Sequence, residues 1–306
     1  MRFNPKARLD TSRVRDAGRG SGGRRRGGGG TSLPTSVAGG GGVIGVIIAI
    51  VVFVIVNQGG GGISLPEGGY TTDRFADTGR YDQCRTGDDA NSSADCARVA
   101  VENSLTDYWD DELGSRFRAE GGLVTFTGGI QTECGGASSE VGPFYCPIDE
   151  TIYLDDAFFE DVLAGELKGP EGAFVEPYVL AHEYGHHISN LLGNLSKVKG
   201  DTGPQSSGVR LELQADCFAG MWAKHATETE DAEGNVLLLD LTQQDIDLAV
   251  AAAKSVGDDY IQRRTGGQVD QEVWTHGSSD QRRTWFMTGY TRGSLAACDT
   301  FGADSV

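Results

Sequence analysis

The sequence predicts an α+β fold, rich in helices and with a small sheet, that is preceded by a single transmembrane helix. Several long stretches carry apolar residues at helical spacing, whereas only two short stretches alternate between apolar and other residues as strands do. Many helices with few strands indicate the α+β class. A third observation is an apolar run of 14 residues, 43–56, within a charge-free window between Arg26 and Glu67.

The N-terminal part differs in charge from the rest of the chain. Residues 1–42 contain nine basic and two acidic residues, a net charge of +7, whereas the total is −18 and the remainder carries −25. Such asymmetry indicates that the two parts face different surroundings. The acidic body argues against nucleic acid as a partner, because phosphate binding needs clustered Lys and Arg. The basic part could contact RNA or anionic lipid, or could simply set the orientation in a membrane.

We expect residues 1–36 to be a disordered basic tail, because they are rich in Arg, Gly and Ser. The apolar run is shorter than the roughly 20 residues that span a bilayer, but extending it back through Val37 gives 20 uncharged residues. A cleaved signal peptide would have a short basic region and small residues at its cleavage site, and neither fits here. We therefore expect an uncleaved anchor at 37–58, with a cytoplasmic N-terminus and an extracytoplasmic body.

After a glycine-rich linker at 59–72, residues 73–306 are long enough for one domain with one core. Pro177 falls in the first turns of one predicted helix, where proline is tolerated, and Gly193 would end that helix. Strands are expected at 123–127 and 151–154. Helices are expected from Ser92 or Ser93 to Trp109, from Asp155 or Asp156 to Leu167, and over 173–192, 207–227, 242–264 and 278–289.

Six cysteines are consistent with an oxidising compartment, because an even number in an exported domain suggests disulfides. Six cysteines allow 15 pairings. Proximity in sequence favours Cys84–Cys96 and Cys134–Cys146, which leaves Cys217–Cys298. A zinc knuckle is not indicated, because the chain has no pair of cysteines separated by two residues.

The strongest chemical motif is HEYGH at residues 182–186. On a helix, His182 and His186 share one face and can bind the same metal ion. Glu183 lies beside them and can act as the general base toward a water molecule. Tyr184, Gly185 and the flanking residues are uncharged, as a buried helix requires. The alternative is a pair of helix histidines that serve only in structural hydrogen bonds.

Two histidines do not complete a tetrahedral zinc site. The chain lacks the third histidine that a metzincin would have after the motif. Glu212 and Asp216 lie four residues apart on a predicted helix, which resembles the E-x-x-x-D pattern of the thermolysin-like gluzincins. That resemblance implies that Glu212 is the third ligand of one Zn²⁺ ion and that Asp216 hydrogen-bonds a ligating histidine. The alternative is a solvated acidic helix face.

Residues 73–300 resemble a bacterial family described as "putative neutral zinc metallopeptidase". The resemblance rests on HEYGHH at 182–187, LELQADCFAG at 211–220, and THGSS at 275–279 followed by QR at 281–282 and WF at 285–286. It implies a zincin-like metallopeptidase domain that is anchored in a membrane by a single span. The family description says little about the substrate, and the N-terminal tail lies outside the resemblance.

His276 is a further candidate, because thermolysin-like enzymes use a histidine or tyrosine to donate a hydrogen bond to the oxyanion. It could equally be a structural or capping histidine before a helix. Tyr184 and Tyr290 are weaker candidates for this donor. We expect His187 to pack or to form a local hydrogen bond, and His225 to be solvated.

The leading hypothesis is a membrane-anchored, zinc-dependent peptidase with a peptide or protein substrate. A non-catalytic metal-binding scaffold on the same fold is the main alternative, although the presence of Glu183 argues against it. A third hypothesis is a lipid- or nucleic-acid-binding protein that acts through residues 1–42. The sequence alone identifies neither the substrate nor the position of cleavage.

Overall fold

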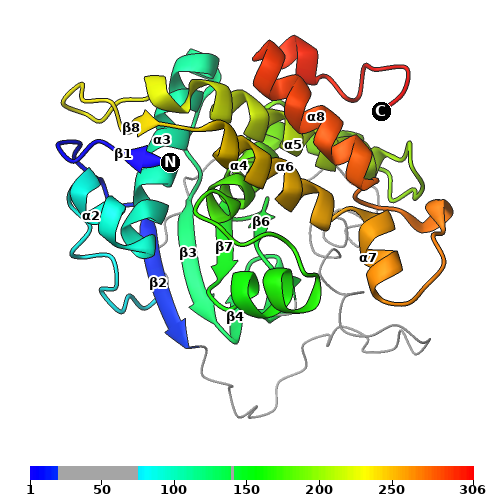
Figure 1. The fold of residues 1–306 in the computed structure, drawn as a ribbon, viewed down its shortest axis with the longest axis horizontal. Coiled ribbons are helices and arrows are strands. Elements are labelled where there is room, and N and C mark those ends of the chain that lie inside the picture. Colours follow the sequence, from blue (N-terminus) through cyan, green and yellow to red (C-terminus); the bar gives the residue numbers. More distant parts are fainter. Residues whose placement is uncertain (20–74, 139–140) are drawn as a thin grey trace.

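The computed structural model describes residues 1–19, 75–138 and 141–306 (Figure 1). Within these ranges the chain mixes helices with a small sheet, which confirms the α+β class. The helices in this part of the chain are all too short or too polar to cross a bilayer. The anchor expected at 37–58 and the linker expected at 59–72 lie outside the described residues.

The main sheet has four strands in the order β2-β3-β7-β6, and two strand pairs accompany it. Strands β2, β3 and β7 run parallel, and β6 closes the sheet as an antiparallel edge strand. The strands are β1 (Arg2–Phe3), β2 (Val14–Arg19), β3 (Gly122–Thr127), β4 (Gly129–Thr132), β5 (Gly135–Ser138), β6 (Phe144–Cys146), β7 (Thr151–Asp155) and β8 (Leu238–Asp240). The two predicted strands are thus β3 and β7, at the centre of this sheet.

The helices of the described chain are α2 (Gly87–Ser92), α3 (Ala94–Leu113), α4 (Val175–Leu191), α5 (Ser207–His225), α6 (Gln243–Ser255), α7 (Asp258–Arg264) and α8 (Ser279–Arg292). Helices α4, α5 and α8 lie close to their predicted positions, α3 continues beyond the predicted end at Trp109, and α2 was not predicted. A π-type segment, η5 (Phe158–Glu166), takes the place of the helix expected after β7. Short 3-10 turns are η3 (Gly114–Arg116), η6 (Asn194–Lys197), η7 (Ala226–Glu228), η8 (Gln271–Val273) and η9 (Leu295–Cys298).

The helix predicted over 242–264 is instead two helices, α6 and α7, with a break at Gly257. A Cβ atom at Gly257 would lie 2.4 Å from the backbone nitrogen of Ser279. The break therefore lets the backbone pass against the start of α8. Residues 242–264 have suitable spacing for one long helix, but this tertiary contact decides the local structure.

The N-terminal segment, which we define as residues 1–19, is folded onto the domain, so the prediction of a disordered tail is wrong for this part. Strand β1 pairs with β8, and β2 pairs in parallel with β3. The overall composition of residues 1–36 is dominated by a glycine-rich stretch that begins only near Gly18. Within the segment, the side chains of Val14 and Asp16 are buried.

The sheet has a different apolar cluster on each face. Leu123, Ile152 and Leu154 belong to the large cluster formed with the helices. Val124 and Tyr153 point to the other face and join a smaller cluster that includes residues of β5 and β6. Strand residues alternate between faces, so β3 and β7 are buried on both sides.

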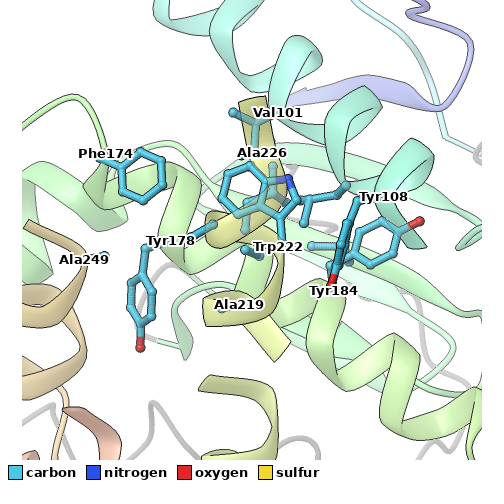
Figure 2. Packing of buried hydrophobic residues seen from close by; sticks show 14 of the residues in the cluster. Val101, Tyr108, Phe174, Tyr178, Tyr184, Ala219, Trp222, Ala226 and Ala249 are labelled. Atoms are coloured by element: carbon cyan, nitrogen blue, oxygen red, sulfur yellow. The ribbon is translucent and has the colours of Figure 1, made fainter. Parts of the chain in front are cut away.

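The large core lies among α3, α4 and α5, and Figure 2 shows Trp222 of α5 at its centre. The Trp222 ring stacks on Phe174, with ring centroids 5.8 Å apart. Its indole N–H donates to Ser104 of α3 at 3.0 Å. Tyr178 and Tyr184, one and two turns from the start of α4, extend this core (Figure 2). The HEYGH motif thus lies on a helix that is fixed by packing.

Three disulfides tie these elements together, and they are the three expected pairs, two favoured by proximity in sequence and the third left by elimination. Cys84–Cys96 joins the segment before α2 to α3, and Cys134–Cys146 joins the β4–β5 turn to β6. Cys217–Cys298 joins α5 to η9 near the C-terminus.

Candidate metal centre

Three side chains of α4 and α5 converge on one point. His182 and His186 lie one turn apart on α4, and Glu212 lies in the second turn of α5. The Nε2 atom of His182 is 3.3 Å from one Glu212 carboxylate oxygen, and that of His186 is 3.4 Å from the other. One ligand atom from each residue lies within 4.8 Å of the others, and all three side chains are largely shielded from solvent. Glu212 therefore stands where the resemblance places the third ligand.

The spacing of these atoms fits a tetrahedral zinc ion. Donor atoms about 2.1 Å from a tetrahedral ion lie about 3.4 Å apart, which is close to the distance between each histidine and the Glu212 oxygen that it faces. The two histidines face different oxygens of this carboxylate. Two imidazole nitrogens and one carboxylate form a ligand set that catalytic zinc sites use, with the fourth position left for water or substrate. The residues present therefore fit one Zn²⁺ ion.

The close approach of α4 and α5 depends on Gly185. A Cβ atom at this position would lie 2.9 Å from both Cα and the carbonyl oxygen of Ala215. Any larger residue would push the two helices apart. Because Gly185 lies between the two histidines and Ala215 lies between Glu212 and Asp216, this contact sets the distance across the metal centre.

Asp216 lies behind His182 and is fully buried. One of its oxygens is 2.9 Å from Nδ1 of His182 and also accepts the Tyr178 hydroxyl at 2.6 Å. Arg282 of α8 donates to both carboxylate oxygens, at 2.8 and 3.0 Å. Asp216 thus fixes the ring of His182 with Nε2 directed to the centre, as the resemblance implies.

Electrostatics favour a negatively charged Glu212 and a neutral His186. Burial opposes ionisation of Glu212, but His186, His182 and His276 outweigh it and hold the pKa of Glu212 well below its usual value. Burial lowers the pKa of His186 to about 4. For His182, burial is outweighed by the Asp216 carboxylate, which raises the pKa to about 9 in the metal-free centre. A metal ion would have to displace that proton from His182.

Glu183 lines the same cavity as the three candidate ligands, but it does not belong to their cluster. It is buried, and burial raises its pKa to about 7. The nearby backbone of Tyr145 in β6 acts in the opposite direction and lowers this pKa, but burial outweighs it. A carboxyl group with this pKa can accept or return a proton near neutral pH.

His276 lies on the loop before α8 and lines the cavity together with the three candidate ligands. Its Nδ1 atom is 3.0 Å from one oxygen of Asp258, the first residue of α7. The other oxygen of Asp258 accepts the backbone N–H groups of Thr275, His276 and Gly277. The N-cap of α8 is Ser278, so His276 does not cap that helix.

The whole cavity measures about 110 Å³, and the rest of its lining is mostly apolar. Besides Glu183, His276, the three candidate ligands, Tyr178 and Arg282, its lining consists of Val141, Pro143, Phe144, Phe158, Leu167, Val179, Val256 and Ile261. These residues come from the approach to β6, from η5, from α4 and from the region of α6 and α7. The centre therefore opens onto a surface suited to an apolar group.

The other predicted candidates lie elsewhere. Tyr184 and Tyr290 are not among the residues that line the cavity. Tyr184 lies 3.2 Å from the Thr106 hydroxyl on the far side of α4. His187 is held between the Arg118 carbonyl and the Tyr145 hydroxyl, and His225 pairs with Glu228 at the end of α5.

Sequence reasoning missed the roles of three residues. Tyr178 precedes the motif by one turn, but a tyrosine at that position also fits an ordinary core residue. Arg282 belongs to a stretch that carried the resemblance, yet no spacing rule links it to Asp216. Asp258 resembles an ordinary acidic residue in the first turn of a helix, and its contact with His276 arises only from the tertiary fold.

Comparison with known proteins agrees with this geometry. The model of the family described as "Putative neutral zinc metallopeptidase" matches residues 1–301, so the match includes the N-terminal segment as well as the body. The uncharacterized protein Rv2575 of Mycobacterium tuberculosis is 48% identical over 235 residues, which cover 76% of this chain and 79% of that protein. The uncharacterized protein YpfJ of Escherichia coli K12 is 38% identical over 205 residues, which cover 63% and 68%.

No solved structure has a significant match to the chain. The family model matches most of the chain, and two histidines and one glutamate converge on one point as a zinc site requires. The chain belongs to the family described as "Putative neutral zinc metallopeptidase".

Proposed function

We propose that this protein is a zinc-dependent peptidase that hydrolyses peptide bonds, with Glu183 as the general base. The observation that carries the proposal is the convergence of His182, His186 and Glu212 on one point, with Glu183 beside them in one cavity. Zinc bound there would supply a Lewis acid that polarises a carbonyl oxygen and lowers the pKa of water.

The remaining steps belong to side chains of this chain. Glu183 accepts a proton from the attacking water at its carboxylate and delivers that proton to the leaving amine. The ring of His276, supported by Asp258, donates a hydrogen bond to the oxygen on which negative charge develops. Asp216 and Arg282 keep the ring of His182 oriented while negative charge develops on the substrate oxygen.

We further propose that the enzyme works in an oxidising compartment outside the cytoplasm. All six cysteines are paired in the structure, and disulfides persist where thiols are not kept reduced. The sequence alone suggests an anchor at residues 37–58, and the pairing of residues 1–19 with the body, described below, argues against a single crossing of a membrane there.

The decisive experiment separates metal binding from chemistry. Glu183→Gln keeps the size of the side chain but removes the base, so zinc content should stay near wild type while cleavage of a peptide library falls about 100-fold or more. His186→Ala should lose both zinc and activity. Asp216→Asn should lie between them, with a loss of about 10–100-fold in metal affinity or activity.

Glu171→Gln is the matched control, because Glu171 is exposed and does not line the cavity. It should retain both zinc and activity. If Glu183→Gln cleaves peptides as fast as wild type, the general-base mechanism is wrong. If wild type binds zinc but cleaves no peptide, the non-catalytic scaffold becomes the better explanation.

A further inference from the structure

The N-terminal segment, residues 1–19, forms an extensive backbone interface with the body of the protein. In β2, residues Val14 to Asp16 pair in parallel register with Leu123 to Thr125 of β3. The Leu123 N–H donates to the Arg13 carbonyl at 2.8 Å. Earlier in the segment, the Gly87 N–H donates to the Ala7 carbonyl at 3.0 Å. Figure 1 shows β1 and β2 in blue, beside β8 and β3 respectively.

The packing of this interface is specific. Phe3, Ala7 and Val14 are each less than 5% exposed and belong to the large core cluster. A Cβ atom at Gly87 would lie 1.9 Å from the carbonyl oxygen of Asn4, so only glycine fits at the start of α2. The segment thus fills a space that the body leaves for it.

A charged residue of the N-terminal segment also pairs with buried acidic residues of the body. Glu102 of α3 and Glu120 before β3 are almost completely buried. The Arg13 guanidinium lies 2.8 Å from the carboxylate of Glu102 and 3.7 Å from that of Glu120. Burial and the neighbouring Glu102 raise the pKa of Glu120, so the cation lies where it offsets a buried acidic pair. Asp16 is also buried, and it accepts hydrogen bonds from Thr78 and Thr125.

This contact reaches the catalytic helix. The Thr106 hydroxyl donates to Glu102 at 3.0 Å and lies 3.2 Å from the Tyr184 hydroxyl. Tyr184 is the residue after Glu183 on α4. Arg13, Glu102, Thr106 and Tyr184 therefore form a continuous polar chain from the N-terminal segment to the helix that holds the metal centre.

We infer that residues 1–19 are an integral part of the peptidase domain and lie on the same side of any membrane as residues 75–306. Strands pair only when their backbones are about 5 Å apart, so two strands separated by a bilayer cannot form the contacts between β2 and β3. A single crossing between residues 19 and 75 would separate them. The inference therefore replaces the arrangement expected from charge, with the N-terminus inside and the body outside.

Thiol labelling in intact cells tests the shared side. Ser12 in the segment and Ser115 in the body are both exposed, and the native cysteines are all in disulfides. In the full-length chain, Ser12→Cys and Ser115→Cys should react alike with a membrane-impermeant maleimide, either both labelled or both protected. Both should react after permeabilisation. Labelling of only one of the two in intact cells would overturn the inference.

Hydrogen exchange tests docking in the purified full-length protein. The amides of Leu123 and Gly87, which donate to carbonyls of the segment, should be protected at least about 100-fold relative to an unfolded chain. Exchange at unprotected rates in the unaltered protein would overturn docking, whatever the variants do.

Variants test the role of Arg13. Arg13→Ala should raise exchange at Leu123 at least about 10-fold, because two buried carboxylates lose their cation. Arg19→Ala, at the exposed end of β2, is the matched control and should change nothing. In a background of Glu102→Gln with Glu120→Gln, Arg13→Ala should have a smaller effect. An equal effect in both backgrounds would show that Arg13 does not act through these carboxylates.

Discussion

At the scale of single residues, Asp258 organises the loop that carries His276. One carboxylate accepts three successive backbone N–H groups and also contacts Nδ1 of the ring. These contacts fix both the backbone and the ring of His276, which stands beside the metal ligands in the cavity.

We predict that His276→Gln lowers kcat about 100- to 1000-fold while KM and zinc content stay near wild type, because the lost donor acts on the transition state. Steady-state kinetics and metal analysis of the purified protein check this result. His225→Gln is the control, because His225 is partly exposed at the end of α5, away from the cavity, and contacts Glu228 and the ring of Tyr108. An unchanged kcat together with a lower melting temperature would show that His276 has a structural role instead.

Helical spacing alone predicts only those parts of the candidate site that lie on a single helix. Residues four apart on one helix share a face, so the relation of His182 to His186 and that of Glu212 to Asp216 follow from the sequence. The resemblance was needed to bring the two pairs together. Tyr178, Asp258 and Arg282 could not be assigned, because their contacts cross between elements and leave no local pattern.

At the scale of elements, α5 and α8 meet through two glycines. A Cβ atom at Gly220 would lie 2.0 Å from the Phe286 carbonyl oxygen, and one at Gly289 would lie 1.8 Å from the Cys217 carbonyl oxygen. The two helices are therefore in backbone contact on both sides. This contact brings Arg282 of α8 close enough to reach Asp216 of α5.

We predict that Gly289→Ala destabilises the protein by about 3 kcal/mol or more, because the added methyl group overlaps backbone atoms that cannot move independently. Urea unfolding measures the change. Gly129→Ala is the control, because its Cβ would meet its nearest neighbour, the Ala137 carbonyl oxygen, at an ordinary 3.5 Å. A loss below about 1 kcal/mol in Gly289→Ala would mean that α8 can shift without cost.

The cavity wall is a second feature at this scale, because it combines apolar residues from η5, α4, α6 and α7. We predict that peptides with a large apolar side chain next to the cleaved bond are hydrolysed about 10- to 200-fold more efficiently than peptides with alanine there. Values of kcat/KM for a matched peptide series measure the preference.

Ile261→Lys tests whether this wall sets the preference. Ile261 lines the cavity and is only partly buried, so a lysine can be accommodated there. The variant should lose activity toward apolar peptides and gain relative activity toward peptides with an acidic residue at that position. An unchanged ranking of the peptides would place the specificity outside this cavity.

At the scale of the whole molecule, the helices and the central strands were predictable, whereas the edges of the sheet were not. Strands β3 and β7 stand out because their apolar residues serve both faces. Strand β6 has only three residues, and β2 lies more than 100 residues before its partner β3. The formation of β2 depends on this long-range pairing and on the ion pair of Arg13 with Glu102, and composition reveals neither of them.

The three disulfides constrain the molecule to different degrees. Cys217–Cys298 joins residues 81 positions apart, whereas Cys84–Cys96 joins residues 12 apart. All four cysteines are at most 1% exposed, so replacement by serine has a similar local cost in both pairs. The longer closed loop restricts the unfolded chain more strongly, and the chain-entropy model gives a difference of about 1.6 kcal/mol between the two pairs.

We therefore predict that the double substitution Cys217→Ser with Cys298→Ser destabilises the protein more than Cys84→Ser with Cys96→Ser. The expected losses are about 4.5 and about 3 kcal/mol, and denaturant unfolding without reductant measures both. Equal losses, or a larger loss for the shorter loop, would show that local packing outweighs restriction of the unfolded chain.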